Sequence, residues 1–134
     1  MSKTFSCRKI AKGCAEGEVI LSKDAVCFYT VEPETGTVIE RDHDLQGQNL
    51  AGKILVMPSG KGSSVVQADG LYKLQLHGKE PLAIVVEHAD TVLVASAIIM
   101  KTPMVHKVNR EFYECVQNGG RVRIDADSGT VTVY

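Results

Sequence analysis

The feature that most restricts the fold is an alternation of apolar runs and helix-periodic segments between residues 54 and 105. Ile54–Met57 and Pro81–Val86 are apolar runs of strand length. Between them, Ser64–His77 carries its apolar residues at helical spacing, and Gly78 is placed to end that helix. This order predicts strand–helix units, in which helices pack against a sheet.

The later segments continue the pattern, because caps and turn residues separate further periodic runs. Asp90 is a predicted N-cap for a helix that is apolar on nearly all sides, so we expect that helix to be buried. The predicted elements are a helix over Thr91–Met100, a strand over Pro103–Val105, a helix over Arg110–Gln117 capped by Asn109, and a hairpin of Arg121–Asp125 with Thr130–Val133.

The first half of the chain is richer in strand patterns. We predict strands over Ser6–Ile10, Gly17–Leu21, Val26–Val31 and Thr37–Glu40, with a turn at Glu32–Gly36 between the last two. No repeat or linker interrupts the sequence, so we expect one domain over residues 1–134. The predicted class is α/β: a β-rich N-terminal half, then a mixed sheet with helices in the C-terminal half.

The near-zero net charge restricts the classes of partner that we expect for this chain. Fifteen basic and sixteen acidic residues give a net charge of −1, which does not favour a nucleic-acid or membrane partner. No apolar run reaches the ~18 residues of a membrane span, and the start MSKTFSCRKI lacks the apolar core of a signal peptide. We therefore expect a cytoplasmic protein.

The cysteines do not form a metal-binding pattern. Cys7, Cys14, Cys27 and Cys115 include no CxxC pair, and no histidine pair has zinc-finger spacing. We interpret them as buried or half-buried small hydrophobic residues, and we expect no metal site on this chain. His43, between two aspartates, is interpreted as a solvated loop residue.

The sequence PSGKGSS at residues 58–64 joins a predicted strand to a predicted helix. Such a junction favours anions, because free N–H groups and the helix dipole point toward the loop. Gly60 and Gly62 permit positive φ, Lys61 can add charge, and Ser63 and Ser64 can donate hydrogen bonds. The segment is neither a Walker A motif nor a GxSxG nucleophile elbow.

A simpler interpretation of the same junction is a tight turn with a serine N-cap. Serine is a preferred N-cap residue, so Ser63 or Ser64 could serve that role alone. From the residues alone, an anion site and a plain cap remain equally open.

Several short motifs together resemble the small swivelling domain of the aconitase X family. The resemblance covers nearly the whole chain, and the order and spacing of the motifs make it specific. The motifs are Ala15–Glu18, Asp42–Gly47, Ala51–Val56, Pro58–Ser64, Ala97–Ile99 and Thr102–Val105. The resemblance implies a β/β/α swivelling domain that covers the active site of a larger subunit, in a heterodimer.

The resemblance also implies an activity. It points to a hydro-lyase subunit that dehydrates (R)-5-phosphomevalonate to trans-anhydromevalonate 5-phosphate. The alternatives are cis-3-hydroxy-L-proline or another hydroxy acid as substrate, or, in a different class, a stand-alone module that binds an anionic metabolite. An iron–sulfur cluster, expected to be [4Fe-4S], is implied for the large subunit and not for this chain.

Residue roles follow by matching the motif. Ser63 matches the serine base of the aconitase superfamily, and Ser64, Gly62, Lys61 and Gly60 would bind substrate or the developing anion. Two positions depart from the pattern. Val65 follows the serines where aconitase has an arginine, and Lys61 stands where many members carry arginine, whose bidentate fork a lysine lacks.

Overall fold

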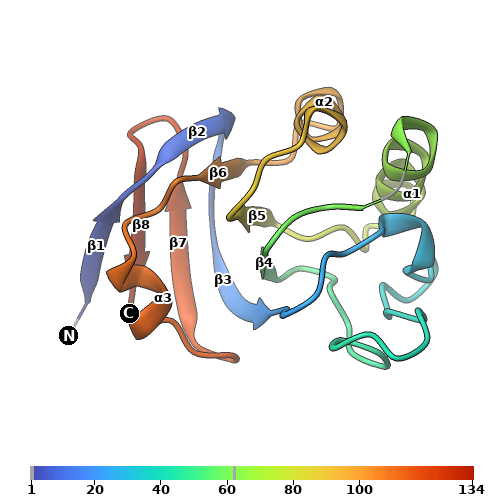
Figure 1. Cartoon of the computed structure of the whole chain (residues 1–134), viewed down its shortest axis with the longest axis horizontal. Coiled ribbons are helices and arrows are strands. Elements are labelled where there is room, and N and C mark those ends of the chain that lie inside the picture. Colours follow the sequence, from blue (N-terminus) through green and yellow to red (C-terminus); the bar gives the residue numbers. More distant parts are fainter. Residues whose placement is uncertain (1, 62) are drawn as a thin grey trace.

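The computed structural model describes residues 2–61 and 63–134, and for residues 64–66 the backbone alone. Within these residues, eight strands form one sheet in the order β1-β8-β7-β3-β4-β5-β6-β2 (Figure 1). The strands are β1 (Lys3–Ser6), β2 (Arg8–Ala11), β3 (Cys14–Leu21), β4 (Ile54–Met57), β5 (Ala83–Val86), β6 (Met104–His106), β7 (Arg121–Asp125) and β8 (Thr130–Val133). The helices are α1 (Ser64–Leu76), α2 (Thr91–Ile99), α3 (Glu111–Cys115) and the 3₁₀ turn η1 (Phe28–Thr30).

The middle of the sheet is parallel and its flanks are antiparallel. β3, β4, β5 and β6 run in one direction, because α1 and α2 are the crossovers from β4 to β5 and from β5 to β6. The carboxyl ends of these strands therefore share one edge of the sheet. The strands at the two ends of the sheet, β1 and β2, are consecutive in the chain and are separated only by Cys7. The sheet must therefore be strongly curved, because one residue connects its two edges.

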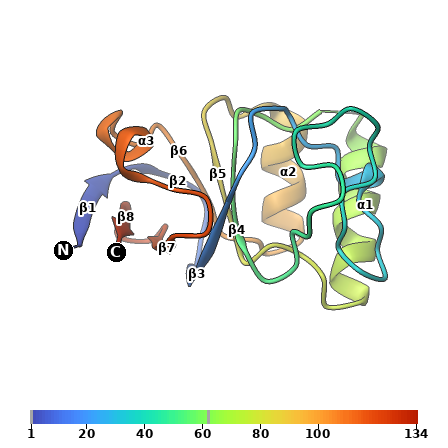
Figure 2. The same cartoon turned by 90° about the horizontal axis from the view of Figure 1, so that it is seen from below.

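The central strands are buried on both faces, as expected when helices cover a parallel sheet. Alternate side chains enter two different cores. Ile54, Val56, Ala83 and Val85 belong to the core that α3 closes with Phe112. Leu55, Met57, Ile84 and Val86 belong to the core beneath α1 and α2. Figure 2 shows α1 and α2 on one side of β4 and β5, with α3 and the antiparallel strands on the other.

Helix α1 packs one of its faces against the core that lies beneath α1 and α2. Gln67, Gly70, Leu71 and Leu74 are buried at helical spacing. The helix ends as predicted at Gly78, which has φ 66° and a hydrogen bond to the Gln75 carbonyl. The next N–H, of Lys79, bonds to Leu74 O at 2.8 Å. The pair of bonds is a Schellman cap.

The predicted elements from residue 54 onward are confirmed to within two residues at each end, while two predicted strands of the first half are wrong. Within residues 26–31, Phe28–Thr30 form the turn η1, and Val26 and Val31 make only isolated bridges. Thr37–Glu40 makes only isolated bridges, at Thr37 and Val38. The predicted strand over Ser6–Ile10 is divided at Cys7 into β1 and β2, and β1 begins earlier than predicted.

Helix α2 is less buried than predicted. Asp90 caps it as expected, since its Oδ1 accepts a bond from Leu93 N at 2.8 Å. However, Ile98 and Ile99 are 55% and 66% exposed. The helix is apolar nearly all round, yet it covers the sheet with one face only. Among the described residues, no helix is both long and apolar enough to cross a membrane.

Candidate functional site

The loop between β4 and α1, described at residues 58–61 and 63, begins at the carboxyl edge of the sheet (Figure 1). Its backbone pairs with the segment that follows β3. Val26 N donates to Ser59 O at 3.2 Å, and Lys61 N donates to Val26 O at 3.3 Å. The loop is thus held by a parallel bridge between Val26 and Gly60.

Gly60 is needed for a different reason than its predicted freedom of φ. It is not one of the glycines with positive φ, so that expectation is wrong for Gly60. A Cβ placed there would lie 2.4 Å from Gln67 Nε2 and 3.2 Å from a Leu93 methyl carbon. A side chain at this position would therefore require the buried end of Gln67 to move. Gly62, the other glycine predicted in the site, lies outside the described residues.

Ser63 occupies the N-cap position of α1, which begins at Ser64. The Ser63 carbonyl accepts the N–H of Gln67 at 3.0 Å, the first bond of the helix, and the residue is exposed. Its hydroxyl is therefore placed where free N–H groups and the dipole favour negative charge. The two interpretations of the sequence, a serine N-cap and an anion site, therefore refer to the same residue, Ser63. The Ser64 side chain is not described.

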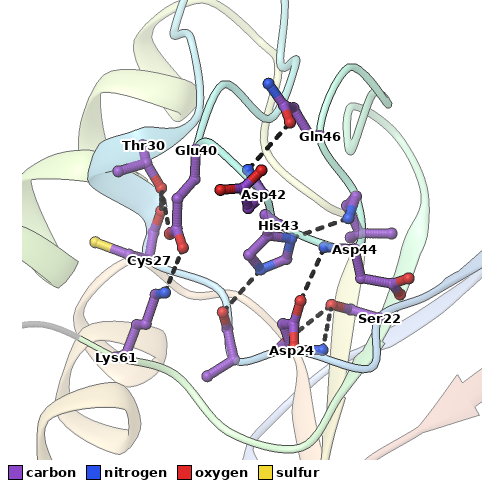
Figure 3. Close-up of polar contacts among 12 residues, drawn as sticks. Ser22, Asp24, Cys27, Thr30, Glu40, Asp42, His43, Asp44, Gln46 and Lys61 are labelled. Carbon is purple, nitrogen blue, oxygen red and sulfur yellow. Dashed lines mark hydrogen bonds and ion pairs between the residues drawn. The ribbon is translucent and has the colours of Figure 1, made fainter.

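Lys61 forms an ion pair with a residue that the sequence did not indicate. Its ammonium lies 2.5 Å from Glu40 Oε2, and Figure 3 shows this pair beside η1. The other carboxylate oxygen, Oε1, is 3.2 Å from Thr30 Oγ1, which also lies 2.8 Å from Cys27 O. The hydrogen bond from Lys61 holds the pKa of the Glu40 carboxyl below its usual value.

His43 is buried, so its prediction as a solvated residue is wrong. It is 7% exposed, and both ring nitrogens have partners. Nδ1 accepts from Leu45 N at 2.9 Å, which leaves Nε2 as the donor to Ala25 O at 2.9 Å. The ring links the segment beyond β3 to the loop around residue 43 (Figure 3).

The two aspartates beside His43 do different things. Asp44 accepts the Lys23 N–H at 2.9 Å and donates its own N–H to Asp24 at 2.8 Å. Asp42 takes positive φ, at 63°. Asp44 and His43 therefore fasten residues 22–26 to residues 40–46, and the bridge to Gly60 passes this support to the candidate loop.

Gln67 is the second residue near the loop that sequence reasoning missed. It is fully buried, and its Oε1 accepts from Phe28 N at 3.4 Å. Its Nε2 faces Gly60 and has no hydrogen-bond partner among the residues that the structure describes. Glu40 is 21 residues from Lys61 in sequence and Gln67 is 39 from Phe28. No local motif marks pairs so distant.

A hollow of about 480 Å³ lies beside the loop, at the carboxyl edge of the parallel strands. It reaches Pro58 from β4, Ser22 and Lys23 after β3, and Glu87 after β5. Tyr113 of α3 also lines it, and burial, with the charge of Glu87 nearby, raises the pKa of Tyr113 to about 12. Ligands of open α/β sheets commonly bind at this edge.

The cysteines do not assemble into a cluster-binding set. Among the described residues, the one group of three potential ligands is Cys14 with Asp125 and Asp127, within 4.8 Å of one another. An iron–sulfur cluster needs several thiolates, and this group has one thiol. The hydrogen bond between Cys14 and Asp125 raises the pKa of that thiol. The described residues therefore do not fit such a cluster. Cys14 is exposed, contrary to prediction, while Cys27 is buried.

The sequence profile described as "Aconitase X swivel domain" matches residues 4–133. The chain belongs to this family. The "Phosphomevalonate dehydratase small subunit" of Thermococcus kodakarensis is 46% identical over 127 residues, which cover 94% of this chain and 92% of that protein. The protein of the same name from Methanosarcina acetivorans is 37% identical over 125 residues, covering 92% and 86%.

Solved structures show the same fold. The crystal structure of Thermococcus kodakaraensis aconitase X in its holo-form matches with a TM-score of 0.89 at 44% identity, covering 98% of each chain. The solution NMR structure of a UPF0107 protein matches with a TM-score of 0.87 at 37% identity, covering 98% of this chain and 99% of the other. The aconitase X swivelling fold read from the sequence motifs is therefore confirmed.

Proposed function

We propose that this swivel domain is the small subunit of a heteromeric hydro-lyase. The complex converts (R)-5-phosphomevalonate to trans-anhydromevalonate 5-phosphate in a modified mevalonate pathway in the cytoplasm. The proposal rests on one observation: Ser63 stands exposed at the N-cap of α1, in a chain whose near-full-length relatives carry that dehydratase name.

In this proposal Ser63 is the base. It removes a proton from the carbon next to the substrate carboxylate, while the hydroxyl leaves from the neighbouring carbon. Ser63 then releases the proton, so that each turnover loses one proton and one hydroxide, which together make one water. A serine hydroxyl is a weak acid, and its alkoxide needs strong stabilisation. The N–H groups at the start of α1 and the helix dipole supply stabilisation at this position.

The rest of the loop forms the proposed substrate-binding surface. Ser64 and the backbone of Gly60 and Gly62 would donate hydrogen bonds to the substrate or its developing anion. Lys61 contributes positive charge, although Glu40 already shares it. The chain thus offers a base and an anion-favouring loop, and the proposal assigns the remaining groups to the large subunit.

The iron–sulfur cluster belongs to that large subunit in this proposal. The cysteines described here do not form a ligand set for it. Of the two bond-breaking events, we therefore assign the proton transfer to this chain, and we assign to the partner the group that assists departure of the hydroxyl. Neither subunit is expected to turn over substrate without the other.

The test is to purify the chain with its large subunit and assay the complex on 5-phosphomevalonate and on cis-3-hydroxy-L-proline. We expect turnover of the first, and a loss of about 10²–10⁴-fold in kcat for Ser63→Ala with the subunits still assembled. Thr91→Ala, which removes an exposed hydroxyl from the start of α2, is the matched control and should keep wild-type activity.

Three results would contradict the proposal in different ways. Conversion of cis-3-hydroxy-L-proline alone would show that it, and not 5-phosphomevalonate, is the substrate. Wild-type kcat in an assembled Ser63→Ala complex would remove the base assignment. Tight binding of an anionic metabolite by the chain by itself, with no large subunit to be found, would indicate a stand-alone binding module.

A further inference from the structure

The loop that carries Ser63 is tied to the rest of the chain through a carboxylate on another segment. Glu40 lies on the long connection between β3 and β4, and its side chain reaches across to Lys61 (Figure 3). The Glu40 side chain is 24% exposed and that of Lys61 is 44% exposed. The pair therefore sits at the surface but is partly shielded from solvent.

Glu40 is itself held in place. Thr30 Oγ1 lies 3.2 Å from its Oε1, and the backbone next to it is fixed because Ile39 N donates to Thr30 O at 2.9 Å. Both carboxylate oxygens therefore have a partner, one on η1 and one on the loop. A carboxylate fixed at two points can orient the ammonium group that it binds.

Lys61 is fixed at its backbone as well as at its side chain. Its N–H donates to Val26 O at 3.3 Å, so the residue is held at both ends. Ser63 follows two residues later, at the N-cap of α1. The contacts of Lys61 therefore fix the chain close to the proposed base.

We propose that Glu40 is a positioning residue, which acts through Lys61 to hold the loop and so to orient the Ser63 hydroxyl. This inference rests on the proposed function, because it assigns Ser63 the task of the base. Lys61 then serves mainly as a tether of the loop. Its charge is shared with Glu40, and it is not the principal ligand of a substrate carboxylate or phosphate.

The kinetic test uses the assembled complex with Glu40→Gln, Lys61→Met and the double variant. Glutamine keeps the shape of Glu40 and loses its charge. Surface ion pairs contribute little, so we expect kcat to fall about fivefold in each single variant, with KM changed less than twofold. Since both changes break one contact, the double variant should be no slower than the slower single variant.

Glu34→Gln is the matched control, because Glu34 is an exposed carboxylate on the same connection between β3 and β4. It should keep wild-type kinetics. Glu40→Asp should restore part of the lost kcat, since it returns the charge on a shorter side chain.

Opposite outcomes would overturn the proposal. If Glu40→Gln lowers KM, then Glu40 competes with substrate for Lys61 and does not position it. If the two single effects multiply in the double variant, the residues act separately. A large rise of KM in Lys61→Met alone would make Lys61 a direct substrate ligand.

A second measurement does not need turnover. Hydrogen exchange of the full chain should be faster at residues 59–61 in Glu40→Gln than in wild type, and unchanged in Glu34→Gln. If the wild-type complex were inactive on both substrates, the proposed function would fail. The exchange measurement would still test whether the contact between Glu40 and Lys61 holds the loop. Unchanged exchange at residues 59–61 would overturn the tether itself.

Discussion

Near the candidate loop, the pKa of the Glu40 carboxyl is shifted from its ordinary value. The hydrogen bond and charge of Lys61 lower the pKa of its carboxyl, burial opposes them, and Thr30 and His43 act in the same direction as Lys61. A pKa that is lower in the folded state adds stability above the carboxyl's ordinary value, and that stability is lost as pH falls through the lowered pKa.

We therefore predict a pH-dependent difference between wild type and Glu40→Gln. Wild type should have the higher melting temperature near pH 7, because its carboxylate is charged and paired. The difference should shrink as the pH is lowered past the ordinary carboxyl pKa and vanish below the lowered one. Thermal unfolding of both proteins at matched ionic strength between pH 7 and pH 3 measures it. A difference that stays constant over this range would exclude the ion pair as its cause.

The candidate loop could be located from the sequence, but its support could not. The order of apolar strand, small residues and helix placed PSGKGSS at a helix N-terminus, because that pattern is local. Glu40 contacts Lys61 of the loop, and His43 supports the adjoining segment at Ala25, only because the long connection folds back on them. His43 looked solvated because its neighbours in sequence are charged, whereas its neighbours in space are the Ala25 carbonyl and the Leu45 N–H.

At the scale of elements, the contact between α1 and η1 is unusually close. A Cβ on Gly70 would lie 2.5 Å from Phe28 C and 2.6 Å from Tyr29 N. These are backbone atoms, which cannot move aside as the end of a side chain can. The helix therefore approaches the turn at the one residue without a side chain.

We predict that Gly70→Ala destabilises the protein. Alanine normally favours a helix interior over glycine by about 1 kcal/mol, but overpacking against fixed atoms costs typically ~1–3 kcal/mol or more. The clash should dominate, and Gly70→Ser should be at least as damaging. Urea unfolding should show a lower midpoint with an unchanged slope. A midpoint equal to or above that of wild type would mean that η1 can shift away from α1.

The same contact explains why one strand prediction failed and others succeeded. β4, α1 and the hairpin of β7 and β8 have strong local patterns, and their tertiary setting agrees with them. Residues 26–31 carry β-branched and aromatic residues that favour a strand, but this segment passes under α1 with Phe28 fully buried and turns there as η1. Packing against Gly70 thus overrides the local preference.

At the scale of the whole molecule, one sheet separates two hydrophobic cores. Ile84 and Val85 are neighbours on β5 and are both fully buried, yet Ile84 faces the core of α1 and α2 while Val85 faces the core of α3. Each core uses the same strands as one wall. Unfolding of either core should therefore expose one face of the central strands and destabilise the other core, which packs on the opposite face.

This arrangement predicts a single cooperative unfolding unit. Ile84→Ala should cost about 2–5 kcal/mol, and Val85→Ala less, since it removes fewer carbon atoms. Each variant should speed the slowest hydrogen exchange by the same factor on both sides of the sheet, in α1 and in β7, because both amides would exchange through global unfolding. Acceleration confined to α1 in one variant and to β7 in the other would show two independent layers. In that case the loop before α1 could move without α3, and the face that this domain presents to a partner would not be rigid.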